Sequence, residues 1–195
     1  MQEIDLKTLL VLLMLRKEKI MGRYRLKEIL DMREHEGIVR RMLETLALGQ
    51  LVRPTRSGCV LTEMGAQTVS RLLSEKGIVD VEELDLKDAG IGPESAAIQL
   101  RRKSVETSII ALRDMAVKVG ARGAIILTYK EGELGDMSVY RSLSSRHPEI
   151  TSRLKRSFTL LEDDVVIVGF ADTYPKALQG ALMVGLEIGR SEIVK

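Results

Sequence analysis

Apolar residues recur at helical spacing in three stretches near the start of the chain. The first stretch follows Asp5, a residue type that caps helices, and predicts a helix over residues 5–17. Its apolar residues occupy more than one face, so we expect this helix to be buried nearly all round or to be used in dimerisation. The second and third predicted helices cover residues 25–32 and 35–48.

Two short apolar runs joined by a polar turn follow the third predicted helix. Gly49 is placed to end that helix. Strands of about four residues flank Arg56, Ser57 and Gly58, where the glycine can adopt the positive φ that a tight hairpin requires. Thr62 then caps a fourth helix. The predicted order is three helices, two strands and a helix.

Past Gly77 the pattern changes to strands interspersed with helices. Strands are predicted over residues 78–86, 96–101, 124–129, from 133 onward and over 165–170, and helices over 105–119, 148–158 and 173–189. After the first strand this order fits a ferredoxin-like α+β sandwich with an added helix. We therefore expect an α+β chain with two domains, residues 1–76 and 77–195.

Charge is distributed unevenly between these two parts. Residues 1–76 hold 14 Lys and Arg against 10 Asp and Glu, whereas residues 77–195 hold 16 against 18. A basic excess in the first part is typical of a phosphate-binding module. Aromatic residues make up only 3% of the chain and Trp is missing, so contacts to nucleic acid are expected from charge and hydrogen bonds and not from stacking.

Several classes of function lack their usual residues. One cysteine and two histidines cannot supply a disulfide or a zinc site. No P-loop, dinucleotide fingerprint or nucleophile motif is present, which predicts a protein that is not an enzyme and uses no cofactor or metal. An acidic start and a short first apolar run predict no signal peptide and no membrane span, hence a cytoplasmic protein.

Three segments of the first part resemble the winged-helix domain of prokaryotic transcriptional regulators. They are GRYRLKEIL at residues 22–30, EGIVRRMLETLALGQLV at 36–52 and CVLTEMG at 59–65. In that family the middle segment is the recognition helix, which runs into the wing. The resemblance implies an N-terminal winged helix-turn-helix that binds double-stranded DNA, in a regulator that is a homodimer because two half-sites double the contacts. The acidic turn at residues 33–36 departs from this pattern.

The second part of the chain also resembles a known family. Its segments ARGAIILTYKEGEL and DDVVIVGFADTYPKALQGALMVGLEI, together with a winged helix, are similar to an uncharacterised archaeal family whose C-terminal part has no established function. This part is expected to bind a small effector or to mediate dimerisation. Two alternatives stay open: an enzyme that carries the winged helix as a regulatory module, and a winged helix used only for protein contacts.

The candidate DNA contacts fall on three elements of the first part. In the third helix the spacing of Ile38, Met42 and Leu46 predicts that these side chains face the core. Arginine can pair with guanine O6 and N7, so Arg40 and Arg41 are the preferred base contacts. The full predicted set is His35, Gly37, Arg40 and Arg41 on the third helix, Arg23, Arg25 and Lys27 at the second helix, and Arg53 and Arg56 on the hairpin. The alternative is a solvated charged face.

Four further residues are candidates for an effector site. Asp172 and Thr173 precede the last helix, where they either offer its N-terminus to an anion or cap it. Arg141 and Arg146 lie in a Ser-rich loop, where they either neutralise an acidic effector or are simply solvated.

Two other features have both a functional and an ordinary structural explanation. Residues 162–164 form an acidic turn that either holds a divalent metal or is only solvated. Cys59 is either a redox sensor or, as is more common for a free cysteine on the same strand face as an inward Leu61, a small buried apolar residue.

Overall fold

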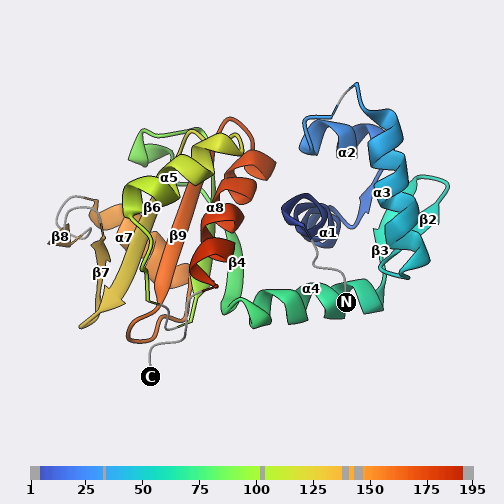
Figure 1. Cartoon of the computed structure of the whole chain (residues 1–195). Coiled ribbons are helices and arrows are strands. Elements are labelled where there is room, and N and C mark those ends of the chain that lie inside the picture. Colours follow the sequence, from blue (N-terminus) through green and yellow to red (C-terminus); the bar gives the residue numbers. More distant parts are fainter. Residues whose placement is uncertain (1–4, 33, 102–103, 138–140, 143–146, 191–195) are drawn as a thin grey trace. The chain divides into compact units, whose positions relative to one another are not determined.

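Both parts of the chain combine helices with antiparallel sheet, which confirms the predicted α+β class (Figure 1). The computed structural model describes residues 5–32, 34–101, 104–137, 141–142 and 147–190. The chain divides into two units, Met1–Leu72 and Leu73–Lys195. The boundary expected between residues 76 and 77 lies just after the helix that begins in the first unit and ends in the second.

The N-terminal unit holds a three-stranded sheet among its helices. In chain order the elements are α1 (Leu6–Glu18), β1 (Ile20–Met21), α2 (Arg23–Ile29), α3 (Glu36–Leu48), β2 (Val52–Thr55), β3 (Gly58–Leu61) and α4 (Glu63–Glu75). The predicted four helices and hairpin are confirmed. The strand β1, too short to show a period, was not predicted, and it joins the sheet in the antiparallel order β1-β3-β2.

In this unit, individual residues determine where α1 begins and where α3 ends. The Asp5 side chain accepts a hydrogen bond from the backbone N–H of Thr8 at 2.9 Å, so the predicted cap of α1 is confirmed. Every residue from Leu9 to Leu15 is buried, as expected for a helix that is apolar on more than one face. At the end of α3, Gly49 is the C-cap, but Gln50 and not the glycine takes the positive φ, of 57°.

The β2–β3 hairpin closes through a loop of two residues, because Thr55 is paired with Gly58. Gly58 has the predicted positive φ, of 145°, and a Cβ there would collide with the carbonyl of Met21 on β1. Thr62 caps α4 as predicted, since its Oγ1 accepts a hydrogen bond from the N–H of Gly65 at 2.9 Å.

The buried face of α3 differs from the predicted one. Val39, Leu43 and Leu46 are its buried residues, whereas Ile38 is 50% exposed and Met42 is half-buried. The prediction that Ile38 faces the core is therefore wrong. Two apolar pairs, at positions 38 and 42 and at 39 and 43, share the helical spacing, and packing against the rest of the unit selects the second pair.

The C-terminal unit is built on one six-stranded sheet. Its elements are β4 (Ile78–Leu84), a short 3₁₀ helix η1 (Lys87–Ala89), β5 (Glu94–Leu100), α5 (Ile109–Lys118), β6 (Gly123–Lys130), β7 (Glu133–Asp136), β8 (Arg141–Ser142), α7 (Pro148–Ser157), β9 (Val165–Ala171) and α8 (Tyr174–Ile188). Each predicted strand and helix is present, and β8 and η1 are additions. The strand order is β4-β5-β9-β6-β7-β8, with antiparallel neighbours throughout.

This strand order corrects the ferredoxin-like prediction. In a ferredoxin-like sandwich the third of the four strands lies between the first two, which here would place β7 between β5 and β6. Instead β9 pairs with both of them, and β7 lies outside β6. The β6–β7 hairpin, closed by the turn at residues 131–132, is common to both arrangements. The difference is that β7 lies on the outer side of β6, and β9 takes the place between β5 and β6.

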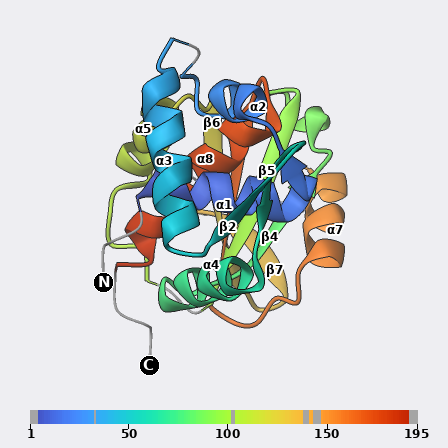
Figure 2. The same cartoon turned by 90° about the vertical axis from the view of Figure 1, so that its right-hand side faces the viewer.

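Helices cover both faces of this sheet (Figures 1 and 2). On one face α5 and α8 pack against each other and against the strands. A Cβ on Gly169 of β9 would collide with the carbonyl oxygen of Ala177, which shows how closely α8 approaches the sheet. On the other face α7 buries Ile150, Leu154 and Phe158 against the apolar residues of β5, β6, β7 and β9. None of the helices in the described ranges is long and apolar enough to cross a membrane.

Candidate nucleic-acid interface

A groove of about 550 Å³ lies in the N-terminal unit between α3 and the β2–β3 hairpin. Arg23 lines it from the start of α2, Arg40 from α3 and Arg56 from the hairpin turn, and Glu44 lies on the same wall as Arg40. The fold therefore brings three predicted cations, from segments far apart in the sequence, to one concave surface.

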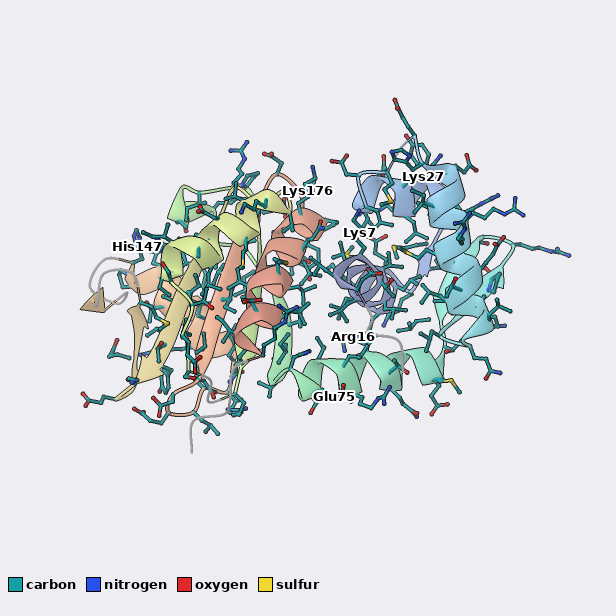
Figure 3. The ribbon with its side chains drawn as sticks, viewed as in Figure 1. Lys7, Arg16, Lys27, Glu75, His147 and Lys176 are labelled. Carbon is teal, nitrogen blue, oxygen red and sulfur yellow. The ribbon has the colours of Figure 1, made fainter. Side chains whose placement is uncertain are left out.

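Glu36, the first residue of α3, is shared by two of the predicted cations. Lys27 Nζ, on α2, lies 3.6 Å from Glu36 Oε2 (Lys27 is labelled in Figure 3). Arg23 Nη1 lies 4.0 Å from Glu36 Oε1, and both of these side chains are more than half exposed. Because the Arg23–Glu36 pair is accessible to water, it is weak, and a phosphate that approaches can replace the carboxylate. The Lys27 side chain is only 19% exposed, so its pair with Glu36 is more sheltered.

Two other predicted cations have acidic partners closer by. Arg40 Nε donates to Glu44 Oε1 at 2.9 Å, one helical turn away on α3. Arg25 Nη2 donates to Glu18 Oε1 at 2.9 Å, and this hydrogen bond is the main reason that the pKa of the Arg25 guanidinium is raised. Arg25 thus links α2 to the end of α1, and we assign it a structural role beside any contact to a ligand.

Three predicted cations differ from these four. Arg41 on α3, Arg53 on β2 and Arg56 in the hairpin turn are exposed, and within the described ranges none of them has an ion pair or a hydrogen-bonded partner for its side chain. An exposed guanidinium without an acidic neighbour keeps its full attraction for an anion. Among the cations that the sequence predicts to contact DNA, these three arginines are the strongest candidates for anion contacts.

The remaining predicted residues of α3 lie at its N-terminus. His35 occupies the N-cap position, is exposed, and makes no capping hydrogen bond with its side chain. Gly37, in the first turn, is also exposed. The N-terminus of this helix is therefore open to solvent, with Glu36 as the acidic residue in its first turn.

Cys59 lies on the floor of the groove and is only 7% exposed. Burial raises the pKa of its thiol, and the nearby positive charge of Arg23 opposes that rise. A buried thiol with a raised pKa is a poor nucleophile. The interpretation of Cys59 as a small buried apolar residue is confirmed.

The candidates in the C-terminal unit do not gather into one site. Thr173 takes the N-cap position of α8, but its side chain makes no capping hydrogen bond. Asp172 Oδ1 instead lies 2.6 Å from Arg122 Nη2, in an exposed ion pair. Arg146 and the side chain of Arg141 lie outside the residues that the structure describes, although the backbone of Arg141 belongs to β8.

The acidic turn before β9 is engaged by protein partners. The buried Asp164 accepts hydrogen bonds at Oδ2 from Gln99 Nε2 and Arg101 Nη1, both at 2.6 Å, and from the N–H of Leu161 at 2.9 Å. Asp163 Oδ1 lies 3.4 Å from Lys130 Nζ. Across the described part of the chain, no three His, Cys, Asp or Glu residues are placed to hold a metal ion together.

Two exposed residues and the acidic partners of four cations in the N-terminal unit were not predicted from the sequence. Tyr24 of α2 is 70% exposed and Ile38 of α3 is 50% exposed. The Arg40–Glu44 pair was predictable from its spacing of four residues. No local signal links Glu36 to Lys27, because that contact forms only when α2 and α3 fold together.

Comparison with known proteins shows a family and a solved structure of similar fold. The model of a domain of unknown function, DUF4443, matches residues 91–188. A hypothetical protein from Pyrococcus horikoshii OT3 has a similar structure, with a TM-score of 0.73 and 29% sequence identity, over 98% of this chain and 96% of that chain. None of the curated proteins matches the chain. The family match lies within the C-terminal unit, whereas the likeness to the archaeal structure extends over both units.

Proposed function

The chain belongs to the DUF4443 family, and from that premise we propose that it is a transcriptional regulator that binds double-stranded DNA with its N-terminal unit. The order of α1, β1, α2, α3, β2, β3 and α4, together with the sheet order β1-β3-β2, supports the assignment of this unit to the winged helix-turn-helix class. In that assignment α3 is the recognition helix and the β2–β3 hairpin is the wing.

The observation that carries the proposal is the contrast among the cations of this unit. Arg41, Arg53 and Arg56 are exposed without an acidic partner among the described residues, and they lie on the recognition helix and the wing. Phosphate binding releases counterions from DNA, and the gain is largest for cations that no carboxylate already neutralises. The groove lined by Arg23, Arg40 and Arg56 gives the DNA backbone a concave surface beside α3.

Binding-site selection from random duplex DNA with the full-length protein tests this proposal. We expect an enriched motif with two-fold symmetry and a binding affinity that falls steeply with salt. If selection enriches no sequence and titration shows no salt-dependent binding to any duplex, the proposal is rejected.

The C-terminal unit is proposed to hold two copies together, with binding of a small effector as a further role. Two exposed apolar side chains on α5 support the first role, since Ile110 is 73% exposed and Val117, two turns away, is 50% exposed. Sedimentation velocity of Ile110→Glu should give a monomer where the unaltered protein is a dimer. A dimer that survives this substitution would remove α5 from the interface.

A second candidate function is binding of a protein partner by the N-terminal unit. Two exposed apolar side chains favour it, those of Tyr24 on α2 and Ile38 on α3, because exposed aromatic and aliphatic groups are common in protein interfaces. Salt dependence separates the two candidates: DNA binding that is weak and insensitive to salt would favour the protein partner.

A further inference from the structure

Gly37 is a glycine that the fold does not require. Among the described glycines, Gly37, Gly90 and Gly132 have no atom within 4 Å of where a Cβ would stand. Gly90 and Gly132 adopt positive φ, which favours glycine, whereas Gly37 is helical and does not. A glycine inside an exposed helical turn weakens the helix relative to alanine. The missing side chain therefore points to something that approaches the helix from outside.

Two neighbours of Gly37 share its side of α3. Ile38 is 50% exposed, and Arg41, three residues further on, is exposed and has no ion-pair partner in the described part of the chain. Residues three and four apart lie on one helical face, so positions 37, 38 and 41 form a continuous surface opposite the buried Val39 and Leu43. This surface combines open space, an exposed aliphatic group and an unneutralised cation.

Arg40 belongs to a different surface of the same helix. It lines the groove beside the hairpin and is bonded to Glu44 at 2.9 Å. The structure thus separates the two adjacent arginines, with Arg40 on the groove side and held by a carboxylate, and Arg41 on the outer side beside Ile38.

We propose that Gly37, Ile38 and Arg41 form the surface of α3 that reads base edges in the major groove, an inference that rests on the proposed DNA binding. The absence of a side chain at Gly37 lets the helix backbone lie close to the bases. Ile38 packs against the 5-methyl group of a thymine, and Arg41 donates two hydrogen bonds to O6 and N7 of a guanine. Arg40 contacts the DNA backbone along the groove.

The spacing of the two side chains limits which bases they reach. Three residues along a helix advance it by about 4.5 Å, and successive base pairs are about 3.4 Å apart. The selected half-site should therefore contain a thymine and a guanine, on either strand, that are one or two base pairs apart.

Chemically altered bases test this assignment on the selected site with the full-length protein. Replacing the thymine by deoxyuridine removes only the methyl group and should weaken binding about fourfold, the value of one buried methyl. With Ile38→Ala protein the two duplexes should bind equally. Replacing the guanine by 7-deazaguanine should weaken binding of the unaltered protein about tenfold and leave that of Arg41→Ala unchanged.

Leu48→Ala is the matched control, because Leu48 is 87% exposed at the far end of the same helix; it should keep the methyl discrimination. Gly37→Ala should lower affinity for the selected site about tenfold while its Tm stays the same or rises by roughly 2 °C.

The assignment is overturned if Ile38→Ala discriminates against deoxyuridine as the unaltered protein does, or if the selected motif lacks a thymine and a guanine at this spacing. Failure of the proposed function itself looks different, because then no duplex is selected and there is no site to alter.

Discussion

Removing the two unpaired arginines of the hairpin should change how DNA binding depends on salt. In the double variant Arg53→Ala, Arg56→Ala, two exposed cations without acidic partners in the described ranges are lost. Each phosphate contact contributes about 0.9 to the slope of log K against log salt concentration, so the slope should become shallower by about 1.8. Between 50 and 200 mM salt, the unaltered protein should then lose about 12-fold more affinity than the variant.

Fluorescence anisotropy titrations of a labelled duplex at four or more salt concentrations measure both slopes. The matched control is Lys118→Ala, Arg156→Ala, which removes the same charge from two exposed residues of the C-terminal unit and should leave the slope unchanged. Arg40→Ala should change the slope less than loss of one hairpin arginine, because Glu44, 2.9 Å from Arg40, offsets part of its charge. Equal slopes for the hairpin variant and the unaltered protein would refute the assignment of Arg53 and Arg56 to phosphates.

Three further predictions concern stability and the thiol. In urea unfolding, Gly169→Ala should lower the free energy of unfolding by about 3 kcal/mol, because the new methyl collides with the backbone of α8; an unchanged midpoint would contradict this packing. Asp164→Ala should cost about 3 kcal/mol, since the Gln99 amide and the Arg101 guanidinium lose their acceptor, whereas Asp163→Asn, which keeps a residue that tolerates the positive φ of this position, should cost less than about 1 kcal/mol. Burial raises the pKa of the Cys59 thiol, so the native state holds its proton more tightly than the unfolded chain. That contribution to stability is complete below about pH 8.5 and is lost as pH rises above it. Cys59→Ala should remove this part of the decline, and a thiol-reactive dye should label Cys59 quickly only after unfolding.

The element order was predictable because each helix and strand carries its own local signal. The Asp5 and Thr62 caps and the Gly58 turn were correct because they depend on residues within a few positions of each other. The sheet order was not predictable, since β9 could pair with several strands of similar apolar character and only the complete sheet selects β5 and β6. A strand as short as β1 cannot be predicted from the sequence, because two residues show no alternation of apolar and polar positions.

In the candidate site, too, local features were predictable from the sequence and contacts between separate elements were not. Arginine on α3 and on the hairpin was evident from the sequence, but whether each arginine is paired depends on contacts such as that between Lys27 and Glu36, which join separate helices. The outward position of Ile38 was missed because its spacing with Met42 resembles that of the true buried pair, Val39 and Leu43. The orientation of an amphipathic helix with a wide apolar face is decided by tertiary packing.

The central position of β9 has a consequence for how the protein is made. On the ribosome, β5 and β6 emerge well before the strand that must lie between them, β9 at Val165–Ala171. Until then both strands have open edges that other nascent chains can pair with. The pairing of Leu100 with Val165 spans a long segment, which slows folding. The N-terminal unit, whose widest strand pairing joins Ile20 to Val60, should fold early during synthesis, whereas the C-terminal sheet should form only once β9 has emerged and should depend more on chaperones.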